Sequence, residues 1–188
     1  MTTLELIKSD FKARGVNPTF SRIIFCALFS YSFKPLIYIR LCNGRSKMCH
    51  FIRPMLIRKL KKRYHIELGC CEIGPYLRLP HPYGIIIAAK RIGENVMIGQ
   101  YVTLGGNNCK ERQDNNGDFI HTPVVGNNCQ ISAGSVVAGP IIIGDNVVIG
   151  ANSTITKNIA SGTLLYNSTG VSRHSYIVPG WKGAFYPA

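Results

Sequence analysis

The chain has 188 residues, which is the size of one domain with a small appendage. Its formal net charge of +13 is uneven: residues 1–65 hold 14 Lys and Arg against 2 acids (+12), and residues 66–188 hold 8 against 7 (+1). The two parts are therefore expected to have different partners. The best candidate for a membrane-spanning helix, residues 23–33, falls well short of the roughly 20 apolar residues required, which excludes a span by that segment.

The first third of the chain has the apolar spacing of helices over residues 4–14 and 20–33. Pro18 lies between these two segments, and Pro35 follows the second. Because residues 20–33 are strongly apolar but short, we expect this helix to lie in a protein core or at a membrane surface. We assign residues 1–64 to a basic helical leader.

Residues 46–63 form a basic amphipathic stretch that is broken or kinked at Pro54. Leu56, Ile57 and Leu60 share one face, and Lys and Arg crowd the others. Two interpretations stay open: a solvated helix face, or peripheral contact with the anionic surface of a membrane or polymer. Nucleic acid is not expected as a partner, because no DNA-binding motif and no regularly spaced aromatic residues accompany the basic run.

An aliphatic side chain recurs about every six residues from residue 73 to residue 155. The positions are Ile73, Leu79, Ile86, Ile92, Ile98, Leu104, Val125, Ile131, Val137, Ile143, Ile149 and Ile155. Three such repeats make one triangular coil of about 18 residues, with the aliphatic side chains stacked inside and Gly or Asn at the corners. The period predicts a mainly β fold, a left-handed parallel β-helix of four coils after a short α-helical segment.

The period breaks at two places, and each contains a histidine. One step carries an extra residue beside His81, and another is lengthened to 21 residues by a polar segment that ends near His121. We predict that residues 105–124 form a loop outside the coils, since long polar loops on a rigid scaffold are often functional. The β-helix is assigned to residues 65–157, and residues 158–188 form a C-terminal tail that covers the open edge of the last coil.

The seven cysteines are odd in number and contain no CxxC pair. They are Cys26, Cys42, Cys49, Cys70, Cys71, Cys109 and Cys129. We interpret them as reduced, structural thiols of a cytoplasmic protein. Cys70 and Cys71 are adjacent, but a strand would point them to opposite faces, so no metal site is predicted.

The segments IGPYLRLPHPYG and GENVMIGQYVTLGG, within residues 73–106, resemble the serine acetyltransferase branch of the hexapeptide-repeat acyltransferases. The resemblance continues through ISAGSVVAGPIIIGDNVVIGANSTI and covers residues 65–157, nearly half of the chain. The opening segments IKSDFKARG and FKPLIYIRLCNG are similar to the short leader of polysaccharide O-acetyltransferases of that branch.

This resemblance implies transfer of an acetyl group from acetyl-CoA to a hydroxyl, in a homotrimer whose active sites lie between neighbouring β-helices. It makes His81 the general base, a role that suits an imidazole near neutral pH. It makes His121 a second active-site histidine across the groove. Glu67 is either the carboxylate that orients His81 or an ordinary exposed side chain, and both interpretations stay open.

The same resemblance places acetyl-CoA along the later coils. The small residues that would admit the pantetheine arm, or that are merely tight corners, are Gly105, Ala133, Gly134, Gly150 and Ala151. Lys157 would meet a phosphate of CoA, or else is a solvated side chain.

Two departures from the serine enzymes bear on the acceptor. Pro80 stands where they have Asp before the catalytic histidine, and Ile120 stands where they have an Arg that pairs with the substrate carboxylate. We therefore expect a saccharide hydroxyl of cell-surface polysaccharide as acceptor, acetylated in the cytoplasm at the inner face of the membrane. Serine O-acetylation is the alternative, and a non-catalytic β-helix scaffold is the alternative of another class. A γ-class carbonic anhydrase is disfavoured, because the repeats lack its short-spaced histidine pair.

Overall fold

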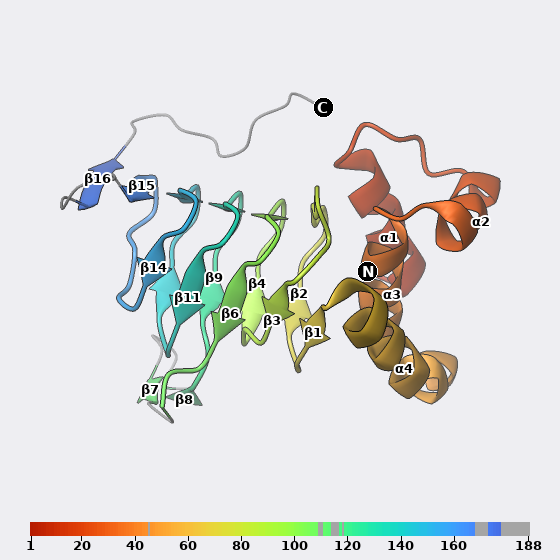
Figure 1. Cartoon of the computed structure of the whole chain (residues 1–188), viewed down its shortest axis with the longest axis horizontal. Helices are drawn as coiled ribbons and strands as arrows, with labels where there is room; N and C mark the ends of the chain where they lie inside the picture. Colours follow the sequence, from red (N-terminus) through yellow and green to blue (C-terminus); the bar gives the residue numbers. More distant parts are fainter. Residues whose placement is uncertain (45, 109–110, 114–116, 118, 168–172, 178–188) are drawn as a thin grey trace.

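The computed structural model describes residues 1–44, 46–108, 111–113, 117, 119–167 and 173–177. Of these, residues 166–167 and 173–177 are described by their backbone alone. It shows a helical leader packed against the first coil of a β-helix (Figure 1). The leader consists of α1 (Thr3–Lys12), α2 (Phe20–Phe29), α3 (Lys34–Cys42) and α4 (Lys47–Lys59), and α4 continues into a π-helical turn, η1 (Leu60–Tyr64).

The helices begin where polar side chains cap them. Thr2 accepts a hydrogen bond from the backbone N–H of Glu5, whose carboxylate accepts from the backbone N–H of Thr2, so α1 starts with a capping box. The prediction of one helix over residues 20–33 is wrong at its end, because α2 stops at Phe29. The helix α3, which we did not predict, follows with Pro35 in its first turn, where the missing N–H of proline costs nothing.

The predicted apolar face of residues 46–63 is confirmed, and it packs inside the protein. Leu56 and Leu60 are buried and Ile57 is partly buried against the same core, which continues into the β-helix. Pro54 lies within α4. Any apolar side chains that residues 46–63 expose to solvent therefore lie on a different face of the helix from this buried one.

Three sheets form the sides of the β-helix, which is left-handed, and the chain passes from sheet A to sheet B to sheet C and back to sheet A. Sheet A contains β1 (Glu67–Leu68), β3 (Ile86–Ile87), β6 (Thr103–Gly105), β11 (Val136–Ala138) and β14 (Thr154–Ile155). Sheet B contains β2 (Glu72–Ile73), β4 (Arg91–Ile92), β9 (Val124–Val125) and β12 (Ile142–Ile143). Sheet C contains β5 (Met97–Ile98), β10 (Gln130–Ile131), β13 (Val148–Ile149), β15 (Thr163–Asn167) and β16 (Arg173–Ile177).

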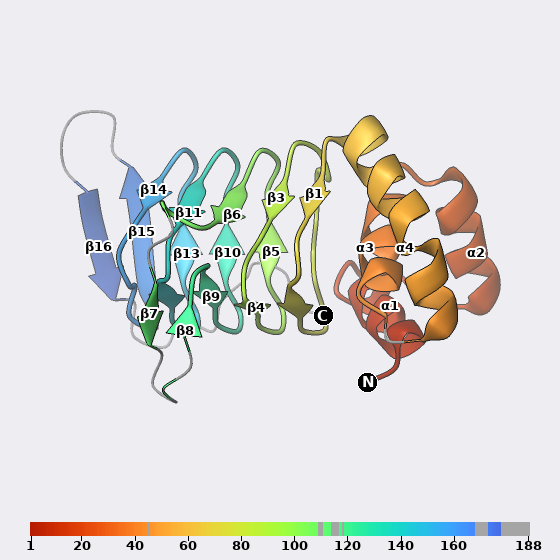
Figure 2. The same ribbon diagram turned by 90° about the horizontal axis from the view of Figure 1, so that it is seen from below.

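The strands within each sheet pair in parallel, apart from the antiparallel pair β15–β16, so the coils lie directly on one another (Figure 2). The predicted aliphatic stack is confirmed: Ile98, Ile131 and Ile149, for example, are fully buried at matching positions of sheet C. We refer below to the turns between successive sheets as the A–B, B–C and C–A corners.

One predicted inward residue is wrong. Ile87, not Ile86, points into the β-helix: it is fully buried and pairs with Leu104 of the next coil, while Ile86 pairs with Thr103 and is half-buried. Since neighbouring side chains of a strand point to opposite faces, the shift by one residue reverses the face. The step from Leu79 to Ile87 thus has eight residues, and the turn around His81 is two residues longer than a regular repeat.

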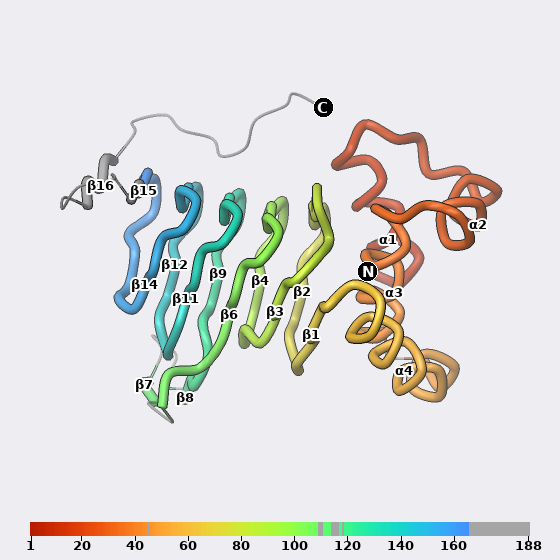
Figure 3. Tube along the Cα trace, viewed as in Figure 1, coloured from red at the N-terminus to blue at the C-terminus, as the bar shows by residue number. Residues whose placement is uncertain are grey.

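The segment within residues 105–124 leaves the β-helix at the A–B corner and projects from its side (Figures 1 and 3). The coils resume directly, because β9 pairs with β4 of the preceding coil. We expected no strands in this loop, but the structure shows an antiparallel hairpin of β7 (Arg112–Gln113) and β8 (Phe119–Ile120).

The repeat also runs beyond Ile155, where we expected it to end. Ile159 forms a β-bridge with Ile143, and β15 pairs in parallel with β13, so a further partial coil follows β14. β16 then pairs with β15 and lies at the edge of sheet C. Residues 178–188 of the predicted tail lie outside the described residues.

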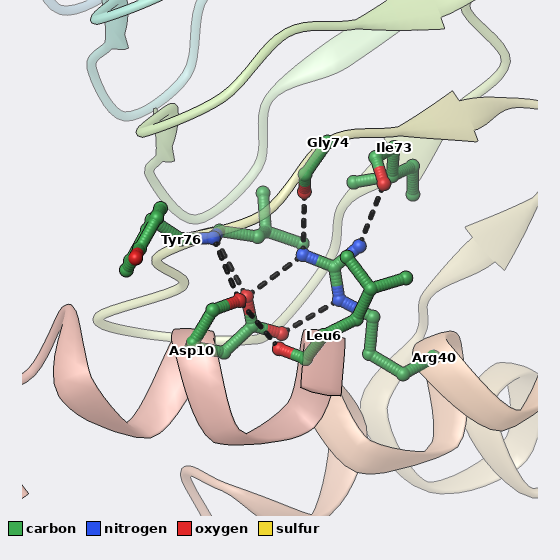
Figure 4. A network of polar contacts seen from close by, with 8 residues as sticks. Leu6, Asp10, Arg40, Ile73, Gly74 and Tyr76 are labelled. Carbon is green, nitrogen blue, oxygen red and sulfur yellow. Dashed lines mark hydrogen bonds and ion pairs between the residues drawn. The ribbon is translucent and has the colours of Figure 1, made fainter. Parts of the chain in front are cut away.

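A buried ion pair joins the leader to the first coil (Figure 4). Arg40 of α3 donates to both carboxylate oxygens of Asp10 in α1, at 2.6 and 2.7 Å, and to the carbonyls of Ile73 and Gly74. The backbone N–H of Leu77 also donates to Asp10, at 2.8 Å. Burial raises the pKa of Asp10, and the hydrogen bonds from Arg40 and Leu77 oppose that rise.

None of the described helices is by itself long and apolar enough to cross a membrane. α2 and α3 reach that length and composition only together, and they meet at an angle of 104°.

Candidate active site

His81 lies exposed in the long turn at the C–A corner of the first coil, between Arg78 in sheet C and β3 in sheet A. Backbone hydrogen bonds hold this turn: the N–H of Tyr83 donates to the carbonyl of His81 at 2.8 Å, and the N–H of Gly84 donates to Tyr64 at 3.0 Å. The side chain of His81 is therefore exposed to solvent on a turn whose backbone is hydrogen-bonded at and just after the histidine.

Four of the small residues predicted to admit acetyl-CoA lie along this same C–A corner, in later coils. Ala133 and Gly134 connect β10 to β11, and Gly150 and Ala151 connect β13 to β14. Because all of these turns join sheet C to sheet A, they lie in register below the turn of His81. The structure thus brings His81 and these four residues to the same edge of the β-helix.

Three other predicted residues, Gly105, His121 and Lys157, lie at the A–B corner. Gly105 ends β6 where the loop begins, His121 lies between β8 and β9, and Lys157 follows β14. A pocket of about 930 Å³ opens between the hairpin and the later coils. Its polar lining residues include Asn107, Glu111, Arg112, Lys157 and Asn158.

The hairpin places two further charged residues beside His121. In the register that pairs Arg112 with Ile120 and Gln113 with Phe119, Glu111 stands opposite His121, and its Oε2 lies 3.8 Å from the Nδ1 of His121. Arg112 stands directly opposite Ile120, the residue that we expected to deprive this corner of a guanidinium. Sequence reasoning missed both Glu111 and Arg112, because pairing across a hairpin leaves no periodic signal in a polar loop.

His81 and His121 of one chain therefore lie at different corners, at opposite ends of the strands of sheet A. One side of the triangular coil holds about six extended residues, so the corners are roughly 20 Å apart. A single chain does not bring the two imidazoles together.

Glu67 lies at the start of β1, one coil before β3, and its exposed carboxylate forms an ion pair with Lys61 at 2.9 Å. The hydrogen bonds and ion pairs of the described residues include none between Glu67 and His81. Its role as the orienting carboxylate stays a prediction.

Most of the thiols in the described part of the chain are shielded from solvent, and Cys70 is the exposed one among them. Burial raises the pKa of Cys42 and Cys129 to about 11 and that of Cys71 to about 12, and Cys70 is exposed. Cys70 and Cys71 lie in a turn between β1 and β2, not in a strand as we expected. Among the described residues, no three His, Cys, Asp or Glu side chains are grouped to hold a metal ion.

Comparison with known proteins gives a consistent result. The family model "Bacterial transferase hexapeptide (six repeats)" matches residues 122–157. A serine acetyltransferase of Staphylococcus xylosus is 35% identical over 161 residues, which are 85% of this chain and 63% of that relative. A serine acetyltransferase of Staphylococcus aureus (strain Mu50) is 42% identical over 91 residues, which are 48% of this chain and 39% of that relative. These similarities support a hexapeptide-repeat acyltransferase of the serine acetyltransferase branch.

Solved structures of this branch share the fold. Serine acetyltransferase 1 of Entamoeba histolytica is 29% identical with a TM-score of 0.60, covering 87% of this chain and 62% of that one. Isoform 3 from the same organism is 25% identical with a TM-score of 0.67, covering 89% and 59%. The chain thus spans less than two thirds of the length of these relatives.

The expected polysaccharide acceptor is wrong for this branch member, because relatives at 35–42% identity and the solved neighbours are serine acetyltransferases. Our expectation depended on Pro80 in place of an Asp and on Ile120 in place of an Arg, and the structure bears on the second of these. Arg112 on the paired strand supplies a guanidinium at the same corner.

Proposed function

We propose that this protein is an acetyl-CoA-dependent serine O-acetyltransferase, which transfers an acetyl group to the Oγ of L-serine. The observation that carries the proposal is the 161-residue alignment with a serine acetyltransferase, which includes most of this chain. The exposure of His81 at a corner followed by small residues supports it, since a thioester arm could approach the imidazole there.

In this proposal His81 is the general base. The hydroxyl of serine has a pKa far above 7, so it attacks a thioester well only if its proton is removed in the transition state. His81 takes the proton from Oγ while Oγ bonds to the acetyl carbonyl carbon. The C–S bond then breaks, and the departing thiolate takes the proton back from the imidazolium, which leaves O-acetylserine and CoA. No covalent enzyme intermediate is needed.

We further propose that the active site is shared between neighbouring chains of a homotrimer. His81 and His121 lie at different corners of one chain, so a common site needs the C–A corner of one chain beside the A–B corner of the next. A closed threefold arrangement repeats that contact three times. Acetyl-CoA then lies along the C–A corner of one chain, and Gly105 and Lys157 reach it from the next.

For the acceptor we propose Arg112 as the group that binds the serine carboxylate. A guanidinium presents paired N–H donors that match the two carboxylate oxygens. Arg112 is exposed, lines the pocket at the A–B corner and directly follows Glu111, whose carboxylate lies 3.8 Å from His121. Lys157 lines the same pocket and is assigned to a phosphate of CoA.

The leader suggests a peripheral contact of residues 46–63 with an anionic membrane surface, which we include in the proposal. Within residues 46–63 the large exposed apolar side chains are Phe51 (87% exposed), Met48 and Met55, which share a helix face at spacings of three and four. The exposed cations of this segment are Lys47, Arg58, Lys59, Lys61, Lys62 and Arg63. Aromatic and apolar side chains flanked by cations are typical of helices that lie in the interface of anionic lipid.

Sedimentation with phosphatidylglycerol vesicles tests this contact. We expect binding that is lost in Phe51→Ser and with phosphatidylcholine vesicles, while Phe119→Ser, which replaces an exposed ring far from the leader, binds normally. Equal sedimentation of the wild type with and without anionic vesicles contradicts the membrane contact. The compartment proposed is the cytoplasm, since the described cysteines are free thiols.

The experiment that tests the main proposal is release of CoA from acetyl-CoA in the presence of L-serine, with O-acetylserine measured by chromatography. We expect formation of O-acetylserine by the wild type and its loss in a folded His81→Ala variant. Retained turnover in that variant contradicts the role of His81.

A further inference from the structure

Tyr101 adopts a backbone conformation that its side chain disfavours. The second position of the C–A corner is left-handed in successive coils, with φ of +67° at Gly84, +57° at Tyr101, +71° at Gly134 and +54° at Asn152. Gly and Asn tolerate this region, but a bulky side chain there costs on the order of 1 kcal/mol. Tyr101 is thus a strained residue beside the candidate active site, where such strain is often functional.

The ring of Tyr101 fills a space that Gly84 leaves open. A Cβ atom on Gly84 would clash with Cδ1 of Tyr101 and lie only 2.6 Å from Cε1. The ring also packs edge-on against Tyr83, with centroids 5.8 Å apart, and the N–H of Tyr101 donates to the carbonyl of Tyr83 at 3.1 Å. Tyr83 packs on its other side against His65, at 5.0 Å.

Those contacts fall on the turn that carries His81. This turn is two residues longer than a regular repeat, and extra backbone residues add conformations that packing must suppress. Tyr83 lies two residues after His81 and donates its N–H to the His81 carbonyl. Gly84, the residue covered by the Tyr101 ring, comes next. Tyr101 therefore restrains Tyr83 and Gly84, the second and third residues after the histidine in this turn.

We infer that Tyr101 is a positioning residue for His81, which acts through Tyr83 and Gly84 to hold the turn in one conformation. The inference rests on the proposed function, in which His81 is the general base. A base displaced by about 1 Å loses on the order of 100-fold in rate, so a strained tyrosine that fixes the base repays its cost in stability.

The chain offers a matched control. Tyr76 has φ of +61° at the B–C corner of the first coil, where Asn95, Asn128 and Asn146 occupy the same position in later coils. Replacing Tyr76 or Tyr101 by Asn therefore relieves the same kind of strain. Only Tyr101 packs on the turn of His81.

The test compares Tyr101→Asn, Tyr101→Phe and Tyr76→Asn by thermal unfolding and by kcat and KM for acetyl transfer. We expect Tyr101→Asn to keep a melting temperature at or above that of the wild type while kcat falls at least about tenfold, with little change in KM for acetyl-CoA. Tyr101→Phe, which keeps the ring, and Tyr76→Asn should retain kcat.

A kcat of Tyr101→Asn within about twofold of the wild type would overturn the inference. So would a raised KM for acetyl-CoA at unchanged kcat, because Tyr101 would then be a wall of the ligand groove. If the wild type makes no O-acetylserine, the proposed function fails, and NMR of isotope-labelled histidine decides the positioning separately. The His81 ring signal, assigned with His81→Gln, should move or broaden in Tyr101→Asn and not in Tyr76→Asn, and an unmoved signal refutes the inference.

Discussion

His81 and His121 lie at opposite ends of the strands of sheet A, one at the C–A corner and the other at the A–B corner. If both serve one active site, the site contains His81 of one chain and His121 of its neighbour. The arrangement explains why two irregular turns, far apart in one chain, both carry a histidine. It also gives a test that does not depend on which acceptor is used.

The first prediction is that two inactive variants restore each other. Homotrimers of His81→Ala and of His121→Ala should each be nearly inactive. After unfolding and refolding of an equal mixture, a site is intact when one chain supplies His81 and the next supplies His121, which random mixing gives for about one quarter of the sites. Acetyl transfer measured before and after mixing checks this. A mixture as inactive as its components would mean that the two histidines do not share a site across chains.

The second prediction concerns Arg112 and the carboxylate of the acceptor. Arg112→Gln should raise KM for L-serine about 10- to 100-fold, because a charge-assisted pair is lost. With L-serinamide, which has no carboxylate, the wild type and Arg112→Gln should differ little. Lys157→Gln is the matched control, since it removes the other cation of the pocket, and it should raise KM for acetyl-CoA only. Equal losses of Arg112→Gln with serine and serinamide would contradict the assigned pairing.

The third prediction concerns the ion pair that attaches the leader. Asp10→Asn leaves the buried guanidinium of Arg40 without its partner charge and should cost about 3–5 kcal/mol of unfolding free energy. Chemical denaturation monitored by circular dichroism measures that loss. Glu5→Gln is the control, because Glu5 is an exposed carboxylate at the start of the same helix and should cost well under half as much. Equal costs would show that the buried pair does not hold the leader in place.

The fourth prediction concerns the thiols. Since burial raises the pKa of Cys42, Cys71 and Cys129 to about 11 or 12, native protein at pH 8 should resist alkylation by iodoacetamide at these residues while exposed Cys70 is labelled. Folded-state pKa values above the ordinary value of 9.0 mean stability that is complete below pH 9 and is lost as the pH rises through 11. Peptide mapping by mass spectrometry checks the first point, and labelling of Cys129 as fast as Cys70 contradicts it.

Sequence periodicity predicted the β-helix because each six-residue side of a coil needs one inward aliphatic side chain. Ile98, Ile131 and Ile149 are such residues on the same side of successive coils. It failed where several neighbouring residues meet that demand equally well. The run of residues 85–87 is Ile-Ile-Ile, so composition alone could not tell that Ile85 and Ile87 point inward and Ile86 outward. Pairing of Ile87 with Leu104 decides the register.

The candidate site was predictable only in part, for a related reason. His81 and His121 stand out because the period breaks beside them. Their partners depend on contacts between segments that no repeat relates, such as Arg112 opposite Ile120 in the hairpin. The acceptor was wrongly predicted from Pro80 and Ile120, and for Ile120 the absence of an Arg at one position was taken as its absence from the whole corner.

We propose that this protein acetylates the hydroxyl of serine, with His81 as the base. The most direct measurement is a chromatographic assay for O-acetylserine with purified wild type, acetyl-CoA and L-serine, alongside His81→Ala of equal melting temperature. The account predicts O-acetylserine and CoA in equal amounts from the wild type and essentially none from the variant. No O-acetylserine from folded wild type, or equal amounts from both proteins, would contradict it.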